Sequence, residues 1–166
     1  MFEQKSVLNL LMPYLVAILL VITNVSNIRI AGLTNVIPPF DLMAVFYFAA
    51  FKNVFVIWFV FLLGIWNDSL NGNPLGATSL CYILLVKFFS LVNGKMLIKE
   101  NFIQVWQQFI IFCFLFLLLK WLILSVFDGT LHSLLNPFLQ LILSSLFYVL
   151  MHKFFDYISN KFGDSN

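Results

Sequence analysis

Residues 37–68 read IPPFDLMAVFYFAAFKNVFVIWFVFLLGIWND and decide how many helices this chain forms. Two apolar runs are separated only by Lys52-Asn53. As a single helix from Pro38 to Trp66, the stretch would be about 43 Å long and would carry a lysine near its middle. A hydrocarbon core is about 30 Å thick, and a lysine at its centre costs about 3 kcal/mol on insertion scales. A helical hairpin that turns at Lys52 avoids both problems, and we adopt it.

The composition of the whole chain predicts that its solvent is lipid. Of 166 residues, 62% are hydrophobic and 10% are charged, and the mean hydropathy is +1.00. Soluble domains carry roughly a quarter of their residues as charges. We therefore expect an all-α integral membrane protein with residues 1–166 in a single membrane domain. The net charge of +2 is too small to indicate nucleic-acid binding. Cys81 and Cys113 lie in apolar runs and are expected to be buried thiols.

The apolar runs predict a bundle of about six transmembrane helices. Each span needs about 20 apolar residues. The expected spans are residues 7–23, 37–51, 54–68, 75–92, 102–127 and 135–155. The first run is read as an uncleaved helix, because polar residues follow it and no small-residue cleavage site does. A five-span arrangement with the N-terminus outside also puts most lysines inside, and its main weakness is a buried Lys52.

Charge placement predicts the orientation. With six spans and a cytoplasmic N-terminus, the cytoplasmic side collects Lys5, Lys52, Lys95, Lys99, Lys153 and Lys161, and the outer side collects only Arg29. This asymmetry follows the positive-inside rule and places both termini in the cytoplasm. Lys120 falls inside a span near the outer end, where Asp41, Asp68 and Asp128 are its candidate partners and snorkelling is its alternative role.

A polar segment from Gly64 to Gly76 joins the third and fourth expected helices. Gly64 permits close contact between helices. Asp68 follows at a helix C-terminus, where the macrodipole disfavours an anion, and this suggests a specific role or partner. The alternative is a solvated turn, because Asn, Gly and Pro are the usual turn residues. Both interpretations stay open on the sequence.

Asp41 follows Pro39 in the first turn of the second expected helix. A carboxylate is favoured there by the helix dipole, so a capping role explains Asp41 without any function. Asp41 and Asp68 lie on the two arms of one hairpin, at the same membrane face. We therefore hypothesise that the two side chains line a common polar pocket, which requires both to lie on the same side of the bundle.

No motif points to catalysis, a cofactor or a metal. His132 and His152 are separated by about a membrane thickness in the expected topology, which makes a shared metal site improbable. No phosphate-binding, dinucleotide-binding or serine-hydrolase pattern occurs. We expect a non-enzymatic protein.

Three sequence elements resemble those of a bacterial family, the rod shape-determining protein MreD. They are Pro39-Phe40-Asp41-Leu42 at a helix start, Gly64-Ile65-Trp66-Asn67-Asp68 at a helix end, and Gly72-Asn73-Pro74-Leu75-Gly76 leading into the next helix. The family usually has an apolar or small residue where Asn67 stands here. The candidate pocket or partner residues are therefore Pro39, Asp41, Gly64, Asn67, Asp68, Gly72 and Gly76.

The resemblance implies a role in cell shape. Proteins of this family belong to the elongation machinery of the inner membrane and are thought to scaffold or regulate sidewall peptidoglycan synthesis. The implied partners are an MreC-like bitopic protein, MreB actin-like filaments, the RodA glycosyltransferase, its class B transpeptidase, and the lipid bilayer. The implied fold is similar to the S-components of energy-coupling-factor transporters, so the alternative function is the substrate-binding membrane subunit of a vitamin-type transporter.

Overall fold

The computed structural model describes residues 2–25, 37–93, 101–131 and 133–163, and this part of the chain is helical without strands. The helices are α1 (Phe2–Val25), α2 (Phe40–Ala44), η1 (Val45–Phe51), α3 (Ile57–Asn71), α4 (Ala77–Asn93), α5 (Phe102–Asp128) and α6 (Leu135–Gly163). The π-helical segment η1 continues α2 directly, so the described part holds six helices at the positions that the apolar runs predict.

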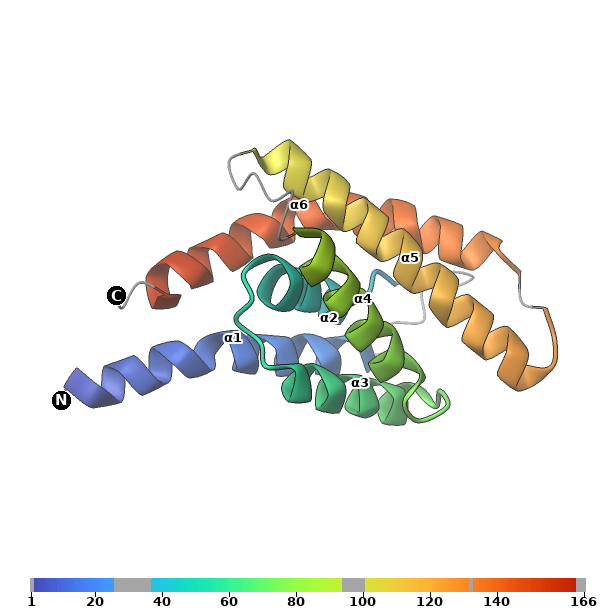
Figure 1. The fold of residues 1–166 in the computed structure, drawn as a ribbon, viewed down its shortest axis with the longest axis horizontal. Helices are drawn as coiled ribbons and strands as arrows, with labels where there is room; N and C mark the ends of the chain where they lie inside the picture. Colours follow the sequence, from blue (N-terminus) through green and yellow to red (C-terminus); the bar gives the residue numbers. More distant parts are fainter. Residues whose placement is uncertain (1, 26–36, 94–100, 132, 164–166) are drawn as a thin grey trace.

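The helices form a bundle in which the start of α1 and the end of α6 lie at the same end (Figure 1). Phe109 of α5 stacks on Tyr148 of α6 with 3.8 Å between ring centroids, and these two long helices run antiparallel. Just before α2, the carbonyl of Ile37 accepts a hydrogen bond of 2.7 Å from the side chain of Gln140 in α6. Tyr47 of η1 then packs on Phe155 near the other end of α6, so α2 and η1 run parallel to α6.

The α2–η1 helix is enclosed by the rest of the bundle. Every residue from Asp41 to Ala50 is at most 6% exposed. In its middle, the Phe46 ring packs at centroid distances of 5.1 to 6.2 Å on the rings of Phe89, Phe109, Phe112 and Tyr148. The five residues of α2 and seven of η1 extend for at most about 18 Å, which is short of a bilayer core of about 30 Å. This helix is therefore a central core element.

The chain turns after η1, as the hairpin interpretation requires, and no single helix covers the whole stretch from Pro38 to Trp66. Lys52 ends the helix with a π-type bond of 2.9 Å from its N–H to the carbonyl of Tyr47. Asn53 then adopts a left-handed φ of 53°, and α3 begins at Ile57, three residues later than predicted. At the other end, α2 begins at Phe40, because Pro39 is its N-cap with an extended backbone (φ −74°, ψ 90°) and Pro38, which precedes a proline, is disfavoured in the helical conformation.

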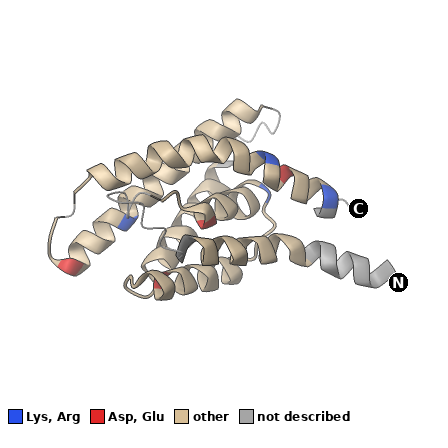
Figure 2. Cartoon of the chain, turned by 180° about the vertical axis from the view of Figure 1, so that it is seen from behind, with Lys and Arg blue, Asp and Glu red and all other residues tan. Residues whose placement is uncertain are grey.

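The described helices carry few charges (Figure 2). Their outward faces bear large apolar side chains repeated every three or four residues, among them Leu11, Leu15 and Leu19 of α1, Trp58, Leu62 and Trp66 of α3, and Leu80, Leu84 and Phe88 of α4. Exposed apolar surface on this scale marks contact with membrane or protein. Within the described part, α5 and α6 are the two helices long and apolar enough to cross a membrane.

Candidate functional site

The side chain of Asp41 joins three helices inside the bundle. Asp41 is fully buried in the first turn of α2. Its Oδ2 atom accepts a hydrogen bond of 2.6 Å from Nδ2 of Asn67 in α3, and a second from the hydroxyl of Tyr82 in α4. A buried carboxyl group without partners is costly, and hydrogen bonds to charged groups contribute about 1.5–3 kcal/mol each. The local sequence supplies the acid, and two other helices supply its donors.

Asn67 extends this arrangement toward the end of α3. Its Oδ1 accepts a hydrogen bond from Nδ2 of Asn71, which also bonds to the Asn67 carbonyl oxygen at 2.9 Å. Tyr82 stacks on Phe116 of α5 with 5.3 Å between ring centroids. We call Asp41, Asn67, Asn71 and Tyr82 the Asp41 cluster. Asn67 is 3% exposed, so its amide is a buried bridging group.

Asp68 caps the next helix. Its Oδ2 accepts hydrogen bonds of 3.0 Å from the N–H of Gly76 and of 3.0 Å from the N–H of Thr78, at the start of α4. The carboxylate thus sits at the unfavourable end of one helix dipole and at the favourable end of the next. This backbone contact supplies a partner for Asp68. Oδ1 of Asp68 and Oγ1 of Thr78 are buried and have no hydrogen-bond partner among the described residues.

Two glycines shape the turn between α3 and α4. Gly72 ends α3 in the left-handed conformation with φ 68°, and Asn73 donates its N–H to the Asp68 carbonyl at 3.1 Å, as in a Schellman motif. Gly76 has φ 96° and donates to the Asp68 carboxylate. Residues with a Cβ are strained in these conformations, so the glycines are needed for the backbone path.

Gly64 lies at a close approach between α3 and α4. A Cβ at this position would lie 2.5 Å from Cα and 2.7 Å from N of Ser79. The Ser79 hydroxyl donates to the carbonyl of Phe61 at 2.9 Å. Both α3 and α4 therefore depend on a glycine at position 64 to hold Asn67, Asp68 and Tyr82 in register.

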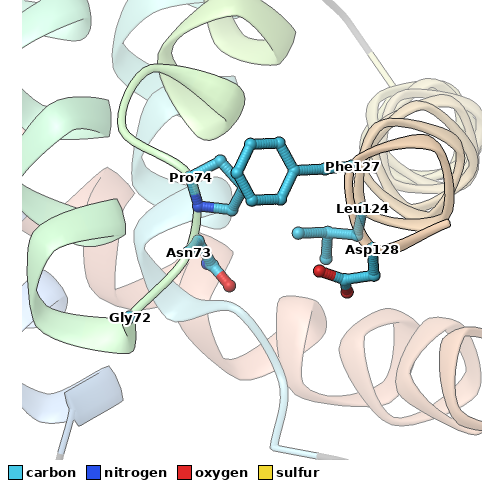
Figure 3. Close-up of a pocket in the computed structure, with 6 residues that line it drawn as sticks. All are labelled: Gly72, Asn73, Pro74, Leu124, Phe127 and Asp128. Atoms are coloured by element: carbon cyan, nitrogen blue, oxygen red, sulfur yellow. The ribbon is translucent and has the colours of Figure 1, made fainter.

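The structure brings the predicted site residues to one end of the bundle but divides them between two contacts. Asp41 bonds to Asn67 and Tyr82, while Asp68 bonds to the start of α4. A cavity of about 460 Å³ adjoins the turn and is lined by Gly72, Asn73, Pro74, Leu124, Phe127 and Asp128 (Figure 3). Neither Asp41 nor Asp68 lines this cavity, so it is not the common pocket that we hypothesised for them. Pro39 is the N-cap of α2 and is buried.

Lys120 is not paired with an acid in the part of the chain that the structure describes. Its ammonium group lies 5.7 Å from the ring centroid of Phe116, within the range of a cation–π contact. The ion pairs considered for Lys120 from the sequence are therefore replaced by an aromatic contact beside the Asp41 cluster.

A second polar cluster, which sequence reasoning missed, lies toward the opposite end of the bundle. The Asp156 carboxylate accepts a hydrogen bond from the Tyr47 hydroxyl and lies 3.2 Å from Nε2 of His152, whose Nδ1 lies 3.3 Å from the Tyr148 hydroxyl. We call Tyr47, Tyr148, His152 and Asp156 the His152 cluster. The spacing of four residues between its three α6 members was the available signal, because it places them on one helix face.

This fold defines a small all-helical protein with a polar cluster toward each end and at least two helices suited to crossing a membrane. The chain belongs to the family described as rod shape-determining protein MreD, whose match covers residues 4–158. The resemblance to this family is thus confirmed, and it indicates a role in rod-shape determination. Comparisons with curated proteins and with solved structures found no match. The likeness to transporter S-components stays a prediction.

Proposed function

We propose that this chain is a non-enzymatic inner-membrane component of the elongation machinery that scaffolds or regulates sidewall peptidoglycan synthesis. The family match over residues 4–158 is the observation that carries the proposal. The two polar clusters support it, because their side chains bond mainly to one another and hold helices together. Nothing in the comparisons supports the transporter alternative.

The proposed topology has six membrane-embedded helices, with both termini in the cytoplasm. The short α2–η1 helix is compatible with it, because a segment enclosed by protein can lie at membrane depth without contacting lipid. In this arrangement the Asp41 cluster and the turn at Gly72 face the outer side, and Lys52 faces the cytoplasm.

The proposed partners are an MreC-like bitopic protein, MreB filaments, the RodA glycosyltransferase and its class B transpeptidase. The outer face of α3 is a suitable surface for a partner's transmembrane helix. It exposes Trp58, Leu62 and Trp66 at 72%, 61% and 40%, spaced by four residues along one stripe. Large aromatic side chains often provide much of the binding energy of an interface, and membrane helices associate through close packing.

Depletion of the protein in a rod-forming host tests the proposed role. Rods are expected to become spheres, and expression of the intact chain from a second copy is expected to restore them. Unchanged rod shape after verified depletion would contradict the proposal. Co-purification with the MreC-like protein and the transpeptidase supports the scaffold role, whereas thermal stabilisation by a vitamin-like ligand without such partners would favour transport.

Two substitutions at Asp68 distinguish a role as a helix cap from a requirement of the partners for its negative charge. Asp68→Asn keeps an oxygen that can accept the backbone hydrogen bonds, whereas Asp68→Ala removes it at a cost of about 0.5–2 kcal/mol for a lost cap. If the cap is the whole role, Asp68→Asn restores rod shape to depleted cells better than Asp68→Ala at matched expression. Equal failure of both variants would show that the negative charge itself is needed.

A further inference from the structure

Two exposed lysines, Lys52 and Lys153, belong to the end of the bundle that carries the His152 cluster. Lys52 follows η1, and its Nζ lies 5.8 Å from the ring centroid of Tyr47 and 5.7 Å from that of Phe51. Both rings pack on His152, at 5.4 Å and 6.4 Å between centroids. His152 immediately precedes the exposed Lys153, so Lys153 extends from α6 at the level of the residue on which these two rings pack.

The charge at this end is positive among the side chains that the structure describes. Four acids have described side chains, and three of them, Asp41, Asp68 and Asp128, belong to the opposite end of the bundle. The fourth, Asp156, bonds to Tyr47 and pairs with His152. Lys153 has no acidic partner within the described residues. A negatively charged ligand is therefore favoured at this surface.

The His152 cluster joins the two elements from which the lysines extend. The bond from Tyr47 to Asp156 spans 109 positions in the sequence and fastens η1 to α6. His152 and Tyr148 add contacts along the same face of α6. Because these contacts hold the backbone beneath both lysines, only the lysine side chains and not the two helices need to become ordered when a ligand binds, and this limits the entropic cost of binding.

The exposed residues along the neighbouring surface of α6 follow one another in the order expected for a helix in contact with lipid. Leu146, Leu150 and Phe154 are exposed by 61%, 67% and 47% and form one apolar stripe. Tyr157 follows at 60% exposed, with the Lys161 ammonium 3.0 Å from its hydroxyl. Apolar, then aromatic, then basic residues along one helix match the passage from acyl chains to headgroups.

We propose that Lys52 and Lys153 bind the phosphate-bearing headgroup of an anionic phospholipid, whose acyl chains lie along the Leu146–Phe154 face of α6. The inference needs the chain to be embedded in a membrane and does not depend on its role in cell shape. The lipid is chosen over a soluble phosphate compound because Lys153 lies next to Phe154 in the exposed apolar stripe of α6.

Native mass spectrometry of the purified full-length chain tests the site. The protein in detergent is titrated with phosphatidylglycerol and, in parallel, with phosphatidylcholine of the same acyl chains. We expect preferential retention of phosphatidylglycerol. The double variant Lys52→Gln/Lys153→Gln is expected to weaken retention by about fivefold for each lysine, the factor typical of one basic residue at an anionic membrane surface.

The matched control is Lys52→Arg/Lys153→Arg, which keeps both charges and should retain the lipid. Thermal melting of all variants excludes a general loss of fold. Equal retention of the two lipids, or unchanged retention in the glutamine variant, would overturn the proposal. Displacement of phosphatidylglycerol by excess inorganic phosphate would also overturn it, because the ligand would then be a soluble phosphate.

Discussion

At the scale of single residues, one oxygen atom of Asp41 connects three helices. Its donors, Asn67 and Tyr82, come from α3 and α4, and the whole arrangement is buried. Truncating one partner leaves the others unsatisfied in an apolar interior, which costs more than the bond itself contributed. The stability of this end of the bundle should therefore respond to small polar changes.

Tyr82→Phe should lower the free energy of unfolding by about 1.5–3 kcal/mol, because it removes one hydroxyl that donates to the buried Asp41 carboxyl group. The ring and its stacking on Phe116 are kept. Unfolding of the purified protein in detergent gives the measurement. Tyr157→Phe is the control at a 60% exposed tyrosine and should change stability by less than about 0.5 kcal/mol. Equal effects of the two substitutions would show that the Asp41 bond contributes no stability.

The sequence predicted the local half of this site. Asp41, Gly64, Asn67 and Asp68 were identifiable because helix ends, glycines and buried polar groups have local signatures. Tyr82 was missed, although a tyrosine in an apolar helix generally needs a partner for its hydroxyl. The Tyr47–Asp156 bond has no local signature, since its partners are 109 residues apart and meet only when the bundle forms.

At the scale of elements, the contact between α3 and α4 depends on Gly64. Gly64→Ala should destabilise the protein by about 1–3 kcal/mol, the usual cost of overpacking, despite the better helix propensity of alanine. The reason is that the new Cβ would lie 2.5 Å from Cα of Ser79, which is backbone and cannot rotate away. Chemical or thermal unfolding measures the change.

A second variant tells whether backbone or side chain causes the clash. Adding Ser79→Ala to Gly64→Ala should recover little stability, because the closest atom at position 79 remains. Full recovery would mean that only the Ser79 hydroxyl was in the way, and that the two helices can separate slightly at low cost.

Helix positions were predictable, but the environment of each helix was not. The apolar runs located most helix ends to within about three residues, although α1 begins five residues before its expected span and α6 ends eight residues after its own, and Lys52-Asn53 located the turn. An apolar segment has the same residue pattern whether lipid or protein covers it. The run from Phe40 to Phe51 therefore looked like a short span, whereas the structure encloses it and winds its second half as a π-helix.

At the scale of the whole molecule, the bundle has two chemically different ends. One end carries the turn at Gly72 with Asp68 capping α4, and the other carries Lys52 and the chain termini (Figures 1 and 2). If the bundle spans the inner membrane as proposed, these ends must face opposite compartments. This requirement depends on α2–η1 and α3 each crossing the membrane. If the two together crossed only once, every later helix would have the opposite orientation.

Cysteine labelling in spheroplasts tests that requirement. The two native cysteines, Cys81 and Cys113, are fully buried, so an introduced cysteine should be the main reactive thiol. Leu75→Cys, at a position 72% exposed in the turn before α4, should react with a membrane-impermeant maleimide in intact spheroplasts. Lys52→Cys and Asn160→Cys, both at exposed positions of the opposite end, should react only after permeabilisation. Labelling of positions 52 and 75 from the same side would contradict the six-helix topology, and with it the placement of the Asp41 cluster at the outer face.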